Sequence, residues 1–270
     1  MSAATITDRE FSQFQRLIHQ IAGISMSPAK KVLVSGRLAK RLRHHQLDSY
    51  GEYFRLLTSG RIQGELQTAV DLLTTTETYF FREPRLFDFL RDQILPAHQP
   101  GRPFRVWSAA SSSGEEPYSI AMTLANRLGE TPWEVIGSDL STRVLEKART
   151  GHYSLERAQH LPKQYLVDYC LKGVGAQAGT FLVDPKVRGR VRFMQINLNA
   201  ELPRLGEFDV IFLRNVMIYF DGETKSRVIA RMLPLLRPGG YFVVGHSESL
   251  NGIGGGLQTV MPSVYRKPRQ

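Results

Sequence analysis

A run of small residues stands between an apolar segment and two neighbouring carboxylates. The apolar FRVW (104–107) is followed by SAASSSG (108–114), and then by Glu115, Glu116 and Pro117. Glutamate and proline are favoured in the first turn of a helix, and small side chains let the backbone approach a ligand closely. The run has one glycine, and two carboxylates would repel a pyrophosphate. It therefore favours a cationic or zwitterionic nucleoside over a dinucleotide, with a simple tight turn as the alternative interpretation.

A second acidic position, Asp139, ends the segment WEVIGSD (133–139) and comes 25 residues after Gly114. At this spacing a carboxylate at the end of the second strand can accept hydrogen bonds from both hydroxyls of a ribose. Capping of the next helix is the alternative role for Asp139, although Ser141 is also available for it. The two segments together predict a nucleoside site.

A third segment, FDVIFL (208–213), is followed by Arg214, Asn215 and Tyr219. An enzyme that methylates amino groups would be expected to carry an Asp/Asn-Pro-Pro-aromatic run here, and this segment has none. A helical stretch, a Pro-Gly-Gly stop at 238–240 and a further strand come next. This order resembles a class I S-adenosylmethionine-dependent methyltransferase.

Strands that alternate with helices must position these residues. Short apolar runs separated by helical stretches predict a parallel sheet covered on both faces: FRVW, EVIGSD, VRFMQI, FDVIFL and YFVVG. The carboxyl ends of parallel strands meet at one edge of a sheet, where open α/β sheets bind ligands. Earlier in the chain, apolar residues at three- and four-residue spacing predict helices over 8–23 and 49–60.

These patterns predict two domains and an insertion. We expect an all-helical domain over residues 1–95, a joint near 95–103, and an α/β, Rossmann-like methyltransferase domain over 96–270. Residues 150–190 exceed a usual crossover connection and predict a small antiparallel β insertion. Within it we expect a helix over 161–173, which would contain Cys170, and a hairpin at Asp184-Pro185.

The composition excludes several classes of protein. With 270 residues, 42% hydrophobic and 22% charged, the chain is in the globular range. Its single cysteine excludes an internal disulfide framework, and its histidines show no metal-ligand spacing, so we expect no metal. The sequence shows neither a signal peptide nor a membrane span, which predicts a cytoplasmic protein without direct membrane insertion.

The net charge of +10 is spread over both halves of the chain, but one stretch stands out. Between Glu10 and Asp48 there are seven lysines and arginines and no acidic residue. A helix over 30–44 would gather basic side chains within an arc of about 100°, beside a stripe of Val34, Leu38 and Leu42. A solvated helix face is the alternative to a binding face. The side chains on this arc are Lys30, Arg37, Lys40, Arg41 and His44.

Four segments in order resemble the motifs of the CheR family, which methylates glutamates of bacterial chemoreceptors. They are TTTETYFFREP (74–84), VWSAASSSGEEPYSIA (106–121), SDLSTRVLEKAR (138–149) and FLRNVMIYFD (212–221). The resemblance implies S-adenosylmethionine as methyl donor and glutamyl methyl esters as product. The cofactor contacts that it implies fall on Thr76, Thr78, Arg82, Glu115, Asp139, Asn197, Leu198, Arg214 and Asn215. As catalytic residues, Arg82 and Tyr219 would touch the substrate carboxylate or the carboxyl end of the cofactor.

The resemblance also implies partners. Methyl-accepting chemotaxis receptors carry their methylation sites on acidic helices, which Lys30, Arg37, Lys40 and Arg41 would bind. The insertion would hold a receptor's C-terminal peptide, as it does in some members of the family, and a surface hairpin that only braces the fold is the alternative. We expect a monomer that binds no nucleic acid. Two alternatives stay open: a nucleic-acid methyltransferase, which would account for the charge, and a catalytically silent receptor-binding module. For single residues, the alternatives are an interdomain salt bridge for Arg82 and core packing for Tyr219.

Overall fold

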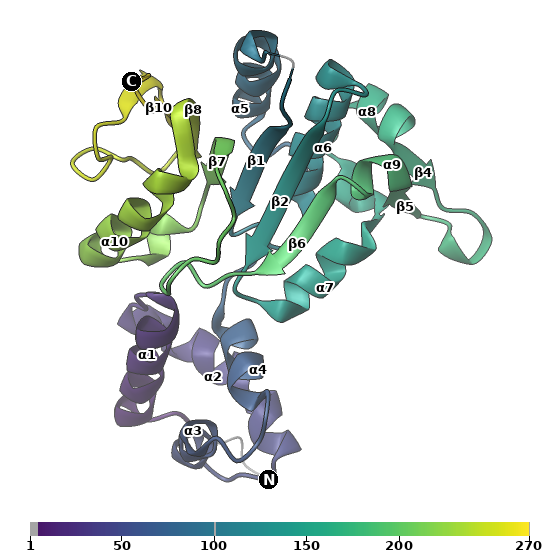
Figure 1. The fold of residues 1–270 in the computed structure, drawn as a ribbon. Coiled ribbons are helices and arrows are strands. Elements are labelled where there is room, and N and C mark those ends of the chain that lie inside the picture. Colours follow the sequence, from purple (N-terminus) through teal and green to yellow (C-terminus); the bar gives the residue numbers. More distant parts are fainter. Residues whose placement is uncertain (1–4, 100, 270) are drawn as a thin grey trace.

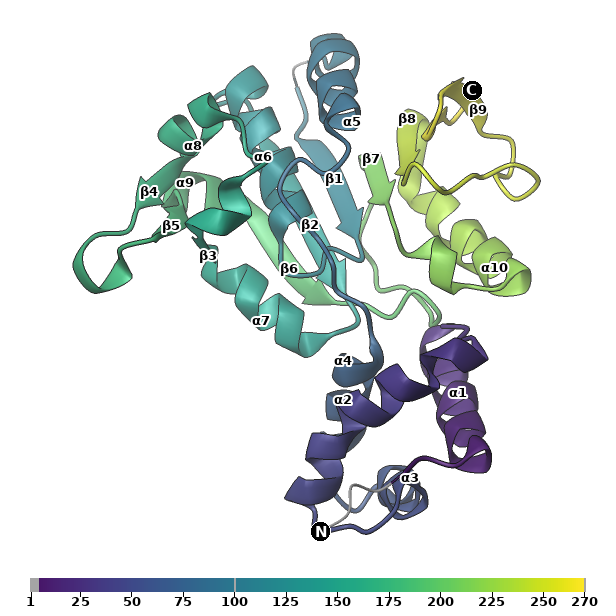
Figure 2. The same cartoon turned by 180° about the vertical axis from the view of Figure 1, so that it is seen from behind.

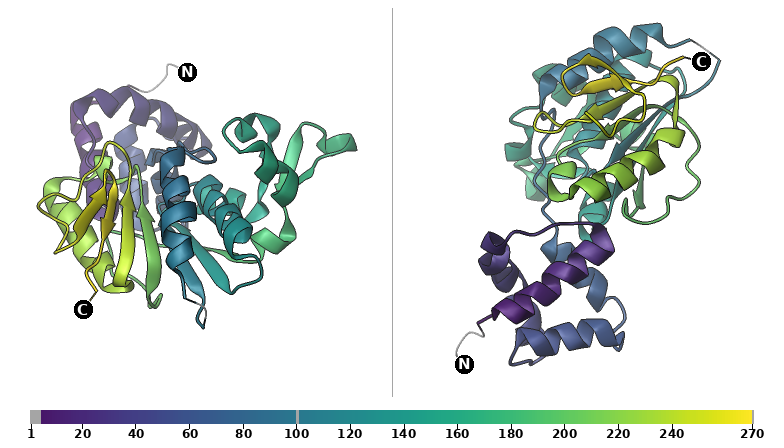
Figure 3. Two further views of the ribbon diagram at one scale, coloured as in Figure 1. Left: turned by 90° about the horizontal axis from the view of Figure 1, so that it is seen from above. Right: turned by 90° about the vertical axis from the view of Figure 1, so that its left-hand side faces the viewer.

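A group of amino-terminal helices lies beneath a sheet in the computed structural model, which describes residues 5–99 and 101–269 (Figure 1). The arrowheads of β1, β2 and β6 point towards these helices, so the carboxyl ends of the strands face them. Seen from the side, the two parts form one elongated molecule with the joint between them (Figure 3). Whatever the strands present at their carboxyl ends therefore lies at this joint.

The amino-terminal helices surround a core of their own. They are α1 (Asp8–Ala22), a 3₁₀ turn (Pro28–Lys30), α2 (Lys31–His44), α3 (Tyr50–Ser59) and α4 (Glu65–Leu73). Thr7 opens a capping box at the start of α1, and Gly23 ends this helix in the left-handed conformation. Leu38 and Tyr53 are completely buried because the apolar stripes of the helices face one another. The helices predicted over 8–23 and 49–60 are confirmed.

The strands of the main sheet follow the order β6-β2-β1-β7-β8-β10-β9. They are β1 (Phe104–Ala109), β2 (Trp133–Asp139), β6 (Val191–Gln195), β7 (Phe208–Leu213), β8 (Leu236–Val244), β9 (Gln258–Met261) and β10 (Val264–Arg266). The first five strands in this order are parallel to one another, and β10 pairs antiparallel with both β8 and β9. In the middle, Val106 of β1 lies opposite Val135 on one side and Val210 on the other. The Rossmann-like class I fold is confirmed.

Helices cover both faces of the sheet because its central strands are apolar on both faces. α5 (Pro84–Phe89) and α6 (Glu115–Leu128) share one core with the sheet, in which Leu86 and Ile120 are buried. α10 (Gly222–Met232) shares a second core, in which Ile229 and Trp107 are buried. α7 (Thr142–Thr150) packs against β2 and β6.

The joint between the two parts lies earlier than the sequence predicts. Phe80, Leu90 and Leu95 are buried in the sheet core, whereas the core of the amino-terminal helices ends at Leu73. α5 continues into a π-helical segment (Leu90–Ile94) and a 3₁₀ turn (Leu95–Ala97). The sequence of an amphipathic helix shows that one face is buried, but not which core buries it. We therefore place the boundary between Leu73 and Phe80 instead of at 95–103.

A small antiparallel sheet projects from the main domain, in the order β3-β5-β4 (Figure 2). Its elements are β3 (His152–Ser154), a 3₁₀ turn (Leu155–Ala158), α8 (Lys163–Tyr169), β4 (Cys170–Lys172), a 3₁₀ turn (Gly175–Gln177), β5 (Thr180–Val183) and α9 (Pro185–Arg188). The hairpin turn is the loop 173–179, whereas Asp184 caps α9 by accepting a hydrogen bond from the N–H of Lys186 at 2.7 Å. Cys170 begins β4 instead of lying within a helix. Burial raises the pKa of its thiol to about 12, which makes it a poor nucleophile.

The Pro-Gly-Gly run at 238–240 lies inside β8 and does not stop a helix as predicted. α10 already ends at Met232, and a 3₁₀ turn (Leu233–Leu235) leads into the strand. A Cβ atom on Gly240 would lie 2.9 Å from the carbonyl oxygen of Asp209. The glycine therefore lets β8 approach β7 closely at this point.

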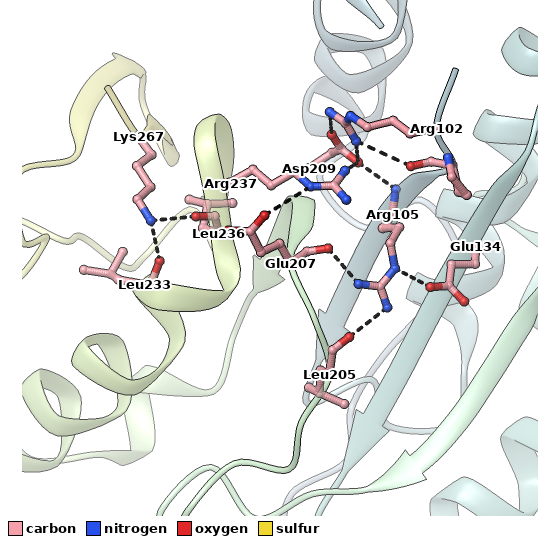
Figure 4. A network of polar contacts seen from close by, with 11 residues as sticks. Arg102, Arg105, Glu134, Leu205, Glu207, Asp209, Leu233, Leu236, Arg237 and Lys267 are labelled. Atoms are coloured by element: carbon pink, nitrogen blue, oxygen red, sulfur yellow. Dashed lines mark hydrogen bonds and ion pairs between the residues drawn. The ribbon is translucent and has the colours of Figure 1, made fainter. Parts of the chain in front are cut away.

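At the amino edge of the sheet, a buried carboxylate joins neighbouring strands (Figure 4). Asp209 on β7 accepts hydrogen bonds from Arg102 at 2.6 and 3.0 Å and from Nη1 of Arg237 at 3.0 Å. It also accepts one from the backbone N–H of Arg105 at 2.8 Å, and Arg105 pairs with Glu134 on β2. Because removal of one partner would leave a buried charge, these contacts stabilise the amino edge, away from the carboxyl ends of the strands.

No helix in residues 5–99 and 101–269 has the length and apolarity needed to cross a membrane. No group of three or more histidine, cysteine, aspartate or glutamate side chains in this part of the chain is arranged to hold a metal ion.

Candidate active site

A cleft lies between the helical domain and the carboxyl edge of the sheet, and its empty space, including the open solvent at its mouth, is about 1280 Å³. One wall comes from α1, α2 and the segment that joins the domains, and the other from the loops that follow β1, β2, β6 and β7. The predicted cofactor and catalytic residues that line it are Thr76, Thr78, Arg82, Asp139, Asn197, Leu198, Arg214, Asn215 and Tyr219. Among the predicted residues of these two groups, the cleft leaves out only Glu115.

The adjacent carboxylates Glu115 and Glu116 face in different directions. Glu115 is completely buried, where it accepts hydrogen bonds from Ser113 Oγ at 2.7 Å and Arg157 Nη1 at 2.8 Å, and burial raises its pKa. Glu116 lines the cleft instead. Because successive helical residues point about 100° apart, only one of the two can face the ligand. The structure therefore does not place Glu115 at the cleft as the sequence predicts, and Glu116 is the carboxylate of this pair that lines it.

The loop after β1 is held to Asp139. The carboxylate of Asp139 accepts hydrogen bonds from the backbone N–H of Ser112 at 2.8 Å and of Ser141 at 2.9 Å. Ala110 and Ser112 have φ values of 62° and 49°, which are strained for residues with a side chain. Burial raises the pKa of Asp139, although the two N–H groups oppose this effect. The arrangement presents a carboxylate to the cleft at the end of β2.

Arg214 uses most of its donors inside the protein. Its side chain is 1% exposed, and it donates to Glu116 Oε2 at 2.7 Å and to the carbonyl oxygen of Arg82 at 2.6 Å. It also forms an ion pair with Glu83 at 3.2 Å. The Nε atom of Arg214 is buried and has no partner in the described part of the chain. Arg214 therefore fixes the loop at 82–83 against α6 while it borders the cleft.

Arg82 and Tyr219 are both available to a ligand. Arg82 donates to the carbonyl oxygen of Glu77 at 3.2 Å and stacks over Tyr79, and it has no carboxylate partner among residues 5–99 and 101–269. An interdomain salt bridge is therefore not its role. Tyr219 is half-buried and lines the cleft, so it is not a core residue. Its carbonyl oxygen accepts a hydrogen bond at 2.7 Å from the N–H of Ser25, which follows α1 in the helical domain.

The loop after β6 is also held by the helical domain. Asn197 Nδ2 donates to the carbonyl oxygen of Ile21 at 2.7 Å, and its Oδ1 accepts from the N–H of Asn199 at 2.9 Å. On the opposite wall, the carbonyl oxygen of Thr76 accepts from Ser112 Oγ at 2.9 Å. These contacts fix the backbone of the cleft from both domains.

The basic side chains of α2 are divided between different surroundings. Lys30 and Arg37 line the cleft, and Arg37 donates to the carbonyl oxygen of Thr74 at 3.1 Å. Lys40 is exposed and lies outside the cleft. Arg41 instead pairs with the buried Glu65, which lowers the pKa of that carboxyl to about 2. Arg41 therefore stabilises the helical domain and does not belong to a free binding face as predicted.

Several residues that shape the site were not predicted from the sequence. Asp71 on α4 accepts hydrogen bonds from the N–H of Thr142 at 3.1 Å, from its Oγ1 at 2.9 Å and from the N–H of Arg143 at 3.3 Å. Asp71 therefore caps α7 from the other domain, and no local pattern signals such a contact. Glu248 follows β8 at the same edge of the sheet as the cleft, and this position after a strand is the pattern from which the sequence could have indicated it.

The polar atoms of the cleft fit S-adenosylmethionine, which carries a ribose, an ammonium, a carboxylate and a sulfonium charge. Asp139 and Glu116 are acceptors suited to hydroxyl and ammonium groups, and Arg82 and Asn215 are donors suited to a carboxylate. Ser111 Oγ, at the loop after β1, is buried and has no partner among the described residues. The acidic character of this wall agrees with a cationic nucleoside.

Two family models match this chain, one over each domain. Residues 9–74 match the family model described as CheR methyltransferase, all-alpha domain, and residues 76–265 match the model described as CheR methyltransferase, SAM binding domain. The chain belongs to the CheR methyltransferase family. It is an S-adenosylmethionine-dependent methyltransferase, and the boundary between the two matches falls within the interval that the two cores define.

Similarity to named CheR relatives extends over both domains. Chemotaxis protein methyltransferase 2 of Pseudomonas aeruginosa is 44% identical over 262 residues, which cover 96% of this chain and 93% of the relative. The chemotaxis protein methyltransferases of Escherichia coli and Salmonella typhimurium are 44% and 41% identical, over 91% and 92% of this chain and 86% of each relative. The resemblance inferred from the four motifs is confirmed.

Proposed function

We propose that this CheR methyltransferase converts glutamate side chains of methyl-accepting chemotaxis receptors to glutamyl methyl esters, leaving S-adenosylhomocysteine. The observation that carries the proposal is the cleft itself, which lies between the two domains and is lined by Arg82, Asp139 and Tyr219. The names of the relatives, chemotaxis protein methyltransferase, support a substrate in chemotaxis.

The cofactor would be held from several loops. Asp139 would accept hydrogen bonds from the ribose hydroxyls, and Glu116 would accept one from the ammonium group. The backbone and side chains at Thr76, Thr78, Asn197, Leu198, Arg214 and Asn215 would complete the site. When bound, S-adenosylmethionine supplies a methyl group on a positively charged sulfonium.

The reaction needs no general base from the chain. A glutamate side chain has a reference pKa of about 4.3 and is already ionised near neutrality. The contribution of the protein is therefore positioning, which lowers the barrier by holding the carboxylate in line for attack. The guanidinium of Arg82 makes one hydrogen bond to the residues that the structure describes, and it keeps donors for one carboxylate oxygen. Tyr219 would orient the same group, and a single contact from each leaves the attacking oxygen more nucleophilic than a bidentate ion pair would.

The receptor would approach over the start of α2. Lys30 and Arg37 at the cleft, with the exposed Lys40, form a positive surface suited to acidic receptor helices. Arg41 is left out of this surface because Glu65 holds it.

The insertion would hold a receptor's C-terminal peptide. β5 is the middle strand, so β4 has a free edge. Leu171 on β4 is 48% exposed and Val174 in the adjoining loop is 76% exposed. A peptide that adds a strand to β4 would satisfy this edge and cover both side chains. We propose that the enzyme works as a monomer in the cytoplasm, held near its sites by this contact.

The test is incubation with methyl-labelled S-adenosylmethionine and receptor fragments, followed by release of methanol in alkali. Label on receptor glutamates that alkali releases supports the proposal, and Arg82→Ala should lose most of that label. Transfer to RNA in place of receptor, or a base-stable label, would contradict it. Receptor binding without any transfer would identify a silent binding module instead.

A further inference from the structure

One carboxylate outside the predicted site, Glu248, gathers backbone N–H groups from the edge of the cleft. It lies in the loop after β8. Its Oε2 atom accepts hydrogen bonds from Asn215 and Gly245, each at 2.8 Å. Its Oε1 atom accepts from the N–H groups of Val216, Met217 and Ile218 at 3.0, 2.8 and 3.3 Å. Both oxygens are therefore fully engaged with the backbone.

Four of these N–H groups belong to the turn that leaves β7. The turn leads into a 3₁₀ segment (Met217–Tyr219), and Asn215 within it has a φ of 57°. Consecutive N–H groups that converge on one point form a concavity that binds anions. Here the anion is a side chain of the same protein, and it stabilises a turn whose Asn215 is in the left-handed region.

The approach of Glu248 depends on a glycine. A Cβ atom at Gly245 would lie 2.7 Å from Asn215 Nδ2 and 2.8 Å from Glu248 Oε2. Only glycine leaves room for the two loops to meet at this distance. The sequence therefore provides both the carboxylate of Glu248 and the glycine that lets the two loops approach each other.

We infer that Glu248 is a positioning residue for methyl transfer. Arg214, Asn215 and Tyr219 line the cleft on the turn that Glu248 holds. Glu248 acts through the backbone of residues 215–218 and is absent from the lining of the cleft. Without Glu248, these N–H groups would form hydrogen bonds with water instead, and residues 215–218 would lose their conformation. The inference rests on the proposed placement of the cofactor in this cleft.

The test compares Glu248 with a carboxylate at the opposite end of β7. Asp209 is buried, holds three donors and lies far from the cleft lining, so Asp209→Asn reports a loss of structural support alone. Full-length Glu248→Ala, Glu248→Gln and Asp209→Asn are compared at a temperature at which all three are folded. The measurements are cofactor Kd by calorimetry, kcat, KM and Tm.

We expect Glu248→Ala to weaken cofactor binding at least tenfold and Glu248→Gln to have an intermediate effect, because glutamine keeps one accepting oxygen. Asp209→Asn should lower Tm while its Kd stays within about twofold of the parent. Unchanged Kd and kcat in Glu248→Ala would overturn the inference, as would an equal rise of Kd in Asp209→Asn. If Asp139→Ala also left Kd unchanged, the placement of the cofactor would fail together with the inference.

Discussion

Two adjacent glutamates at the start of α6 serve different parts of the molecule. Glu115 accepts hydrogen bonds from Ser113 and Arg157 in the interior. Glu116 lines the cleft and accepts a hydrogen bond from Arg214. The helix fixes this division, because its turn separates the two side chains. Exchanging either carboxylate for the neutral amide therefore tests one role at a time.

We predict that Glu116→Gln weakens S-adenosylmethionine binding about tenfold, since a hydrogen bond to a charged group contributes about 1.5–3 kcal/mol. Glu115→Gln should leave the Kd within about twofold because its side chain is buried away from the cleft. Calorimetric titration of both variants measures the difference. Equal losses of affinity would contradict the assignment.

Asp139 should make cofactor binding depend on pH. Burial raises its pKa above the usual value of 3.8. In the proposed site the ionised form would accept hydrogen bonds from the ribose, and this form is present above the folded pKa. Affinity should therefore fall as pH decreases through the raised pKa, earlier than for an ordinary aspartate. Titrations from about pH 8 downward, over the range in which the protein stays folded, measure the profile, and Asp139→Asn should show weak binding that is flat over this range. A decline confined to pH values below 3.8 would refute the prediction.

At the scale of elements, α7 is unusual in how its amino terminus is capped. Ser141 occupies the N-cap position, yet its side chain makes no capping bond and its Oγ atom has no partner among the described residues. Asp71 of α4 supplies the cap from the helical domain. Because α7 begins just after Asp139, this cap also holds the loop that carries Asp139 at the cleft.

We predict that Asp71→Ala lowers the free energy of unfolding by about 1–2 kcal/mol, the usual cost of losing a cap. Cofactor affinity should fall severalfold with it. Ser141→Ala is the matched control, and it should leave both quantities nearly unchanged. Chemical denaturation and calorimetry distinguish the two, and a larger effect of Ser141→Ala would show that the local serine is the cap.

Strands were the elements that the sequence predicted best. The strands β1, β2 and β7 are buried on both faces and therefore appear as continuous apolar runs. The sequence also predicted most of the cleft, because parallel strands bring their carboxyl ends to one edge. It could not predict the pairing of Arg41 with Glu65 or the cap from Asp71, since these contacts join residues on different elements. Nor could it choose between Glu115 and Glu116, because both suit the first turn of a helix.

At the scale of the whole molecule, the positive charge matters where it is exposed beside the cleft. We predict that reversing Lys30 and Lys40 to glutamate raises the KM for receptor, because electrostatic attraction to acidic helices is lost. Added salt should reproduce part of this loss in the parent protein. Reversal of Arg192 on β6 and Arg204 in the loop after it, which are exposed and do not belong to the surface at α2, gives the same net charge. Receptor methylation rates at low salt measure both, and equal effects would show that only net charge matters.

The hydrogen bonds that cross the domain boundary constrain how this enzyme can be re-engineered. Asp71 reaches Thr142, Asn197 reaches Ile21, and Ser25 reaches Tyr219. A chimera that takes its helical domain from another family member would draw the two members of each pair from different parents, even with the crossover placed between the two cores. Such an exchange would need loops of matching conformation, and a matching side chain at the position of Asp71, to keep these contacts. We therefore expect receptor preference and methyl-donor affinity to change together in such a chimera.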